Sequence, residues 1–140
     1  MTADEARSRL AAARVAHLAT AAADGRPHVV PCSFAVIDDA TIVSAVDHKP
    51  KRTTALRRLA NIAANPRVAL LADHYDEDWE ALWWARADGT ARVVEPAAEP
   101  ELRAAAVRAL AARYPPYRAR PPAGALVVIA VERWSGWSAR

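Results

Sequence analysis

The sequence predicts a mainly β fold in which short antiparallel strands form a small barrel with two or three inserted helices. Short apolar runs recur along the chain, and Gly, Pro, Asp or Asn residues separate most of them, which is typical of strands joined by turns. Three segments have the periodicity and end signals of helices. The 140 residues, of which 53% are hydrophobic, are enough to bury one core, so residues 1–140 are expected to form a single domain.

The first half of the chain begins with a helix signal. Thr2 and Glu5 have the spacing of a capping box, which predicts a short helix over residues 3–14. Residues 24–27 (DGRP) are a turn signal between two strands. Pro31 lies within the second of these strands and favours an edge position or a bulge there. The strands predicted in this half cover residues 15–20, 28–36 and 41–46.

Two further helices are predicted after residue 50. Leu56, Leu59, Ala60 and Ala63 share one helical face and predict a helix over residues 53–64, which an Asn-Pro pair ends. Pro100 starts an alanine-rich helix that runs to residue 113 and stops at two prolines. The other predicted segments are a strand over 67–72, strands over 81–86 and 90–94 or one long strand kinked at 88–89, a loop over 118–124, a strand over 125–134 and a tail over 135–140.

A cluster of cations marks the passage from the third strand to the second helix. Residues 49–58 (KPKRTTALRR) carry five cations and two hydroxyls, and residues 49–72 contain no Asp or Glu, although the net charge of the chain is only +3. The first N–H groups of a helix lack partners and the helix dipole is positive there, so cations at this place suit a phosphate. Spacing alone leaves a second interpretation open, in which the segment is a solvated basic helix face.

Several segments, taken in order, resemble one family. Residues 17–20 (HLAT), 24–31 (DGRPHVVP), the cation cluster and 65–71 (NPRVALL) resemble the pyridoxamine 5′-phosphate oxidase-like split-barrel flavoproteins. Three further segments resemble a subgroup that depends on the deazaflavin coenzyme F420: residues 73–79 (DHYDEDW), 82–89 (LWWARADG) and 133–137 (RWSGW). The resemblance implies an FMN-binding-like split β-barrel and a homodimer with two cofactor sites at the subunit interface.

The resemblance also implies a set of cofactor-binding residues. The segment that matches the family's phosphate-binding segment contributes Lys49, Lys51, Arg52 and Thr53, with Arg57 one helical turn further in. The strand that matches the wall beside the cofactor ring contributes Val30, Pro31, Cys32 and Ser33. His48 directly precedes the cations and is the histidine expected near the phosphate. Trp137 is expected to contact the ring or substrate from the tail, across the dimer. Arg58 is expected on the solvated surface, and Cys32 as a small buried side chain rather than a redox thiol.

These features predict an F420-dependent oxidoreductase that transfers hydride between the reduced deazaflavin and a small organic substrate. The cofactor carries out the hydride chemistry, so no catalytic residue is assigned; Tyr75, a histidine or water supplies any proton. Several cations suit the long anionic tail of F420 better than the single phosphate of FMN. The alternatives are an FMN-dependent oxidoreductase of the same family and a non-catalytic protein that binds F420, FMN or haem. No Gly-rich dinucleotide motif, phosphate-binding P-loop or metal-ligand spacing is found, so no metal is expected.

The composition indicates the cellular compartment and the classes of partner that the protein is expected to have. No apolar run approaches the roughly 20 residues that span a bilayer, and the N-terminus has no signal-peptide pattern, so no membrane contact is expected. Cys32 is the only cysteine, which excludes an intrachain disulfide and favours the cytoplasm. Nucleic-acid binding is not expected either, because the cations are confined to one short stretch without interleaved aromatic residues.

Overall fold

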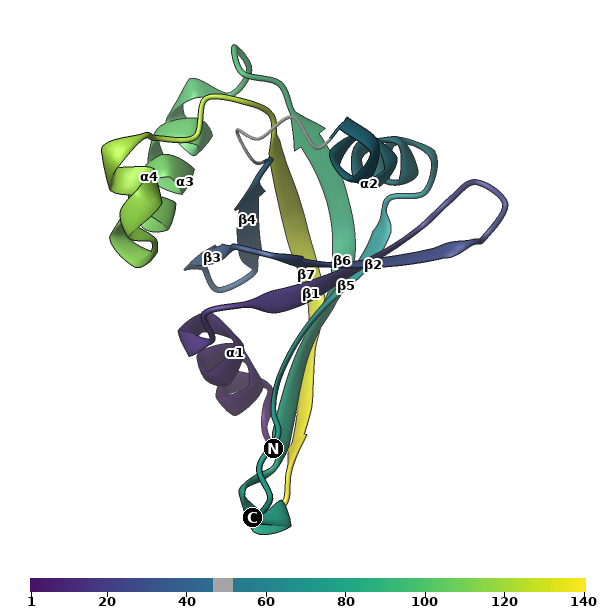
Figure 1. Ribbon diagram of the computed structural model, residues 1–140, viewed down its shortest axis with the longest axis vertical. Helices are drawn as coiled ribbons and strands as arrows, with labels where there is room; N and C mark the ends of the chain where they lie inside the picture. Colours follow the sequence, from purple (N-terminus) through teal and green to yellow (C-terminus); the bar gives the residue numbers. More distant parts are fainter. Residues whose placement is uncertain (47–51) are drawn as a thin grey trace.

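A computed structural model of the protein describes residues 1–46 and 52–140. Its strands form one seven-stranded antiparallel sheet in the order β2-β1-β5-β6-β7-β4-β3 (Figure 1). The strands are β1 (Ala16–Ala21), β2 (Pro27–Cys32), β3 (Ala35–Asp38), β4 (Thr41–Ala45), β5 (Arg67–His74), β6 (Trp83–Val94) and β7 (Leu126–Ser138). The α-helices of the described residues are α1 (Ala3–Ala12), α2 (Arg52–Ala64), α3 (Pro100–Arg113) and α4 (Pro115–Ala119). The predicted mainly β, antiparallel fold is confirmed.

The two outer strands of this sheet are consecutive in the chain. β2 pairs with β1 at one edge, and β3 pairs with β4 at the other, so Ser33 and Phe34 carry the chain from one edge to the other. This corner bends the sheet round, and Figure 1 shows β1 and β2 running across the direction of β4 and β7. The prediction of one strand over 28–36 was therefore wrong, because its two halves pair with different neighbours. The edge position expected from Pro31 is confirmed.

In the C-terminal half, two long strands and a short helix differ from or decide between the expected elements. β6 is one strand of 12 residues with a register shift between Asp88 and Gly89, which decides between the two alternatives for this region. β7 continues to Ser138 because residues 135–138 pair with β6, so the expected tail was wrong over these residues. α4, which begins with two prolines, was not predicted and overlaps the start of the expected loop. Prolines can start a helix because a residue in the first turn has no helical hydrogen bond to lose.

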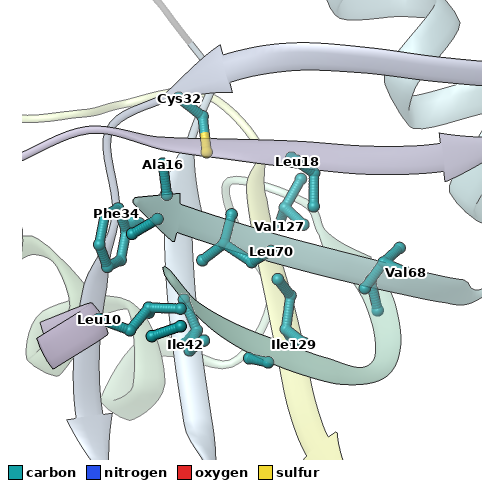
Figure 2. Packing of buried hydrophobic residues seen from close by; sticks show 14 of the residues in the cluster. Leu10, Ala16, Leu18, Cys32, Phe34, Ile42, Val68, Leu70, Val127 and Ile129 are labelled. Atoms are coloured by element: carbon teal, nitrogen blue, oxygen red, sulfur yellow. The ribbon is translucent and has the colours of Figure 1, made fainter. Parts of the chain in front are cut away.

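The core lies on both faces of the sheet near β4 and β7. Ile42 and Ile129 belong to a cluster inside the curved sheet with Leu10, Phe34 and Leu70 (Figure 2). Val43 and Val128, which adjoin Ile42 and Ile129 in the sequence, point to the opposite face of the sheet. They belong to a second cluster beneath α3 and α4, which also includes Leu110 and Tyr117. Both faces are covered there, and β7 accordingly begins with a continuous apolar run over residues 126–131. The second cluster holds α3 and α4 against the corner at residues 33–34.

α2 packs on the sheet through a face that the spacing of its apolar residues indicated only in part: Leu59 packs against the core as expected. The helix is confirmed, and it ends at Ala64 as expected. Ala60 and Ala63 are exposed, however, whereas Arg58, Asn61 and Ile62 are buried. These three residues share one face, and Asn61 Nδ2 donates to Thr20 Oγ1 of β1 at 3.0 Å. Within residues 1–46 and 52–140, no helix has both the length and the apolarity needed to cross a membrane.

Candidate functional site

A pocket of about 420 Å³ lies beside the corner between β2 and β3. Five parts of the chain meet there: the residues just before β1, the corner itself, the end of β4, α2 and the α3–α4 junction. Its lining includes Arg14, Pro31, Cys32, Ser33, Arg58, Tyr114 and Tyr117, and we call it the corner pocket. The volume lies within the range typical of small-molecule and cofactor sites.

The corner pocket contains three of the four residues expected beside the cofactor ring. Pro31, Cys32 and Ser33 line it, whereas Val30 packs against the hydrophobic core. His48, Lys49 and Lys51 lie outside the described residues. Arg52 and Thr53 fall in the first turn of α2, and only their backbone is described. The assignment of these five residues to the phosphate therefore stays a prediction.

Arg57 and Arg58 are neighbours in sequence but line different hollows. Arg58 is only 8% exposed and lines the corner pocket, so the expectation that it is solvated was wrong. Arg57 is exposed and lines a smaller hollow of about 190 Å³ with Asp24, Arg26 and His28. Successive residues of an α-helix point about 100° apart, because a full turn takes 3.6 residues. α2 therefore directs only Arg58 of this pair into the corner pocket.

Trp137 lies at a third hollow, of about 470 Å³, near the far ends of β6 and β7. Its side chain is 47% exposed and lies beside Trp83, Trp84 and Tyr75, which also line this hollow. The third hollow and the corner pocket have no lining residue in common among those described. One copy of the chain therefore does not bring Trp137 to the expected ring wall.

Two tyrosines complete the corner pocket from the α3–α4 junction. The hydroxyl oxygens of Tyr117 and Ser33 lie 2.9 Å apart and share a hydrogen bond. The Tyr114 hydroxyl accepts from the backbone N–H of Phe34 at 3.1 Å and donates to the carbonyl oxygen of Arg14 at 2.9 Å. Together these bonds fix the corner to the start of β1 and to α4. Neither tyrosine was predicted from the sequence, because their partners lie 80 to 100 residues away in the chain.

The described lining of the corner pocket is positively charged. It contains Arg14 and Arg58 but no Asp or Glu. Burial raises the pKa of the Cys32 thiol, against smaller opposite effects of a hydrogen bond with Ser44 and of the positive charge of Arg58. The thiol is therefore neutral at pH 7, and Figure 2 shows its sulfur directed toward the buried side chains. The arrangement suits a ligand that has a flat apolar part and an anionic group.

The comparisons with known proteins agree with this fold. The family model described as pyridoxamine 5′-phosphate oxidase matches residues 2–138. The chain belongs to the pyridoxamine 5′-phosphate oxidase family. The predicted family and its split-barrel fold are thereby confirmed, and flavin-type cofactor binding is supported at the level of the family. A search of curated proteins found no match.

Several solved structures resemble the chain over nearly its whole length. The conserved hypothetical protein Rv2991 from Mycobacterium tuberculosis has a TM-score of 0.73 and 26% identity, over 100% of this chain and 86% of that one. A FAD-binding protein from Mesorhizobium loti has a TM-score of 0.70 and 26% identity, over 97% and 92% of the two chains. HutZ, the heme storage protein of Vibrio cholerae, has a TM-score of 0.67 and covers 96% and 90%; at 19% identity it shows the fold alone.

Proposed function

We propose that the corner pocket binds the ring of coenzyme F420 and that the protein transfers hydride between reduced F420 and a small organic substrate. The observation that carries the proposal is the composition of the pocket: three residues expected at the ring wall lie together with two arginines, and no carboxylate is present among the described lining residues. When bound, the deazaflavin supplies the hydride chemistry. The chain has to bind the ring, orient it and shape the space for a substrate.

The residues of the pocket fit these tasks. Pro31 and the rings of Tyr114 and Tyr117 offer apolar surface to a flat ring. The shared hydrogen bond of Ser33 and Tyr117 holds a transferable proton at the pocket wall. Tyr75, the proton donor considered from the sequence, lies at the third hollow instead. We therefore assign the positioning of a polar ligand group to the Ser33–Tyr117 pair.

F420 is favoured over FMN because positive charge extends beyond the corner pocket. Arg57 and Arg26 line the smaller hollow together with one carboxylate, Asp24, so that arginines outnumber acids there as well. A phosphodiester with a polyglutamate tail makes use of such a path, whereas FMN ends at one phosphate. FMN remains the alternative on the same fold. Haem is less suited, because the described lining of the corner pocket offers no histidine and its one thiol is protonated.

Titration of the purified protein with F420, FMN and haemin in separate experiments tests the cofactor. We expect F420 to bind with a change in its absorption and fluorescence, and to bind more tightly than FMN. Oxidation of pre-reduced F420 on addition of a panel of small organic acceptors then tests catalysis against storage. Binding of FMN or haemin without binding of F420 would show that the choice of cofactor is wrong.

We further propose a homodimer in which Trp137 of one copy completes the corner pocket of the other. Trp137, Tyr75 and Trp79 are large exposed aromatic residues at the far end of the sheet. Exposed aromatic clusters are typical of interaction surfaces. Since one copy keeps Trp137 away from its own corner pocket, a ring contact requires a second copy.

A cytoplasmic location fits the single buried thiol of this chain.

Sedimentation velocity tests the dimer: we expect a species of twice the 15.1 kDa chain mass. In the Trp137→Ala variant, we expect F420 binding to weaken about tenfold, which is the magnitude of a lost aromatic contact. Trp137→Phe keeps a ring and is expected to retain most of the affinity. A monomer with full affinity for F420 would contradict the proposed role of Trp137.

A further inference from the structure

Arg58 differs from Arg103 and Arg113, two half-buried arginines, in the bonds that it makes. Its Nε is shielded from solvent and has no acceptor, and the same holds for nitrogens of Arg103 and Arg113. Arg103 nevertheless donates to the carbonyl oxygens of Glu95 and Gly124, and Arg113 donates to two carbonyl oxygens at the end of α1. No comparable bond or ion pair joins Arg58 to the described residues. Within residues 1–46 and 52–140, its charge is therefore buried without a protein acceptor for Nε.

Among the described residues, nothing around Arg58 neutralises this charge. Cys32 lines the pocket with Arg58, and burial raises the pKa of that thiol, so it stays protonated at pH 7. The other titratable groups of the lining are Arg14, which is also positive, and the two tyrosine hydroxyls. Asn61, one turn along α2, already donates to Thr20. A buried cation without a counter-charge destabilises a fold, so its place at a pocket indicates that a ligand supplies the negative charge.

We propose that Arg58 binds an anionic oxygen of the ligand in the corner pocket. A guanidinium is a planar donor that matches phosphate, carboxylate and the oxygens of an ionised ring, and such charge-assisted hydrogen bonds are strong. Arg58 lies six residues after Arg52, which is about 9 Å along the helix axis. It is thus a second anion-binding position, separate from the start of α2. This inference rests on the proposed function, since it assigns one group of the same ligand.

The role can be tested with Arg58→Met, Arg58→Lys and the control Arg108→Met. Arg108 is exposed on α3 and does not line the corner pocket. In the absence of ligand, we expect Arg58→Met to unfold at the same temperature as the wild type or at a higher one, because a buried charge has been removed. Its affinity for F420 should fall about 10- to 100-fold, the loss expected for a charge-assisted hydrogen bond. Arg58→Lys should lie between, and Arg108→Met should match the wild type.

Two additional ligands identify the oxygen and separate this inference from the proposed function. The phosphate-free deazaflavin riboside should show the same loss of affinity in Arg58→Met if Arg58 contacts the ring, and no loss if it contacts the phosphate. Inorganic phosphate should raise the unfolding temperature of the wild type but not of Arg58→Met, even if F420 does not bind at all. Unchanged binding of all three ligands, or an apo Arg58→Met that melts well below the wild type, would overturn the inference.

Discussion

Replacing Gly89 by alanine is expected to destabilise the protein by about 3 kcal/mol, near the upper end for a single overpacked position. Gly89 lies at the register shift in the antiparallel pairing of β6 with β7. A Cβ atom there would overlap the carbonyl oxygen of Ala130 and lie 3.0 Å from the Cα of Val131. Both are backbone atoms of a strand that is paired on both sides, so neither can move aside as a side chain would.

Urea denaturation measures this effect, and Gly124→Ala is the matched control. A Cβ at Gly124 has only the carbonyl oxygen of Val46 within reach, at 3.9 Å. We expect the control to change the free energy of unfolding by less than about 0.5 kcal/mol. If Gly89→Ala unfolds at the urea concentration of the wild type, the pairing of β6 with β7 tolerates a shift that the structure does not indicate.

Replacing Arg113 by alanine is expected to cost about 3 kcal/mol and to weaken ligand binding at the same time. The Arg113 guanidinium donates to the carbonyl oxygens of Ala11 and Ala13 at the end of α1, and it lies 5.0 Å from the ring centroid of Phe34. Arg14 Nη2 donates back to the carbonyl oxygen of Arg113 at 2.8 Å. The loss of charge-assisted bonds and of a cation–π contact accounts for the magnitude.

The effect on binding follows from the position of Tyr114, which comes next in the chain and lines the corner pocket. Chemical denaturation and F420 titration of the same variant measure both effects. Arg108→Ala, on the exposed side of the same helix, is the control and should change neither. Arg113→Lys should recover part of the stability. An Arg113→Ala variant with wild-type stability would show that α1 and α3 hold together without these bonds.

The parts of the fold that the sequence predicted depend on local signals. The capping box at Thr2 and Glu5 is formed, and Pro31 lies in an outer strand as its missing N–H requires. The missed parts depend on distant partners. Nothing local to residues 28–36 indicates that one half pairs with β1 and the other with β4. Residues 135–138 likewise gain their strand conformation from residues 83–86.

The site shows the same division between local and distant information. The expected ring wall is a continuous segment, so the resemblance proposes Pro31, Cys32 and Ser33 together, and all three line the corner pocket. In the sequence, Arg57 and Arg58 are alike; only the docking of α2 through Asn61 and Ile62 decides which of them is buried. Tyr117 reaches Ser33 across 84 residues of chain, and no spacing rule predicts such a contact. Tertiary packing therefore determines that Arg58, Tyr114 and Tyr117 line this pocket.

The outer strands of the sheet also limit how the protein can associate with other chains. β2 contains Pro27 and Pro31, which have no N–H to offer to an additional strand. β3 has only four residues and ends at Asp38, beside the charge of Asp39. Short outer strands with prolines and charges resist edge-to-edge pairing and the aggregation that follows from it. Association of two copies by strand addition is thereby disfavoured, which leaves contacts between side chains as the route to assembly.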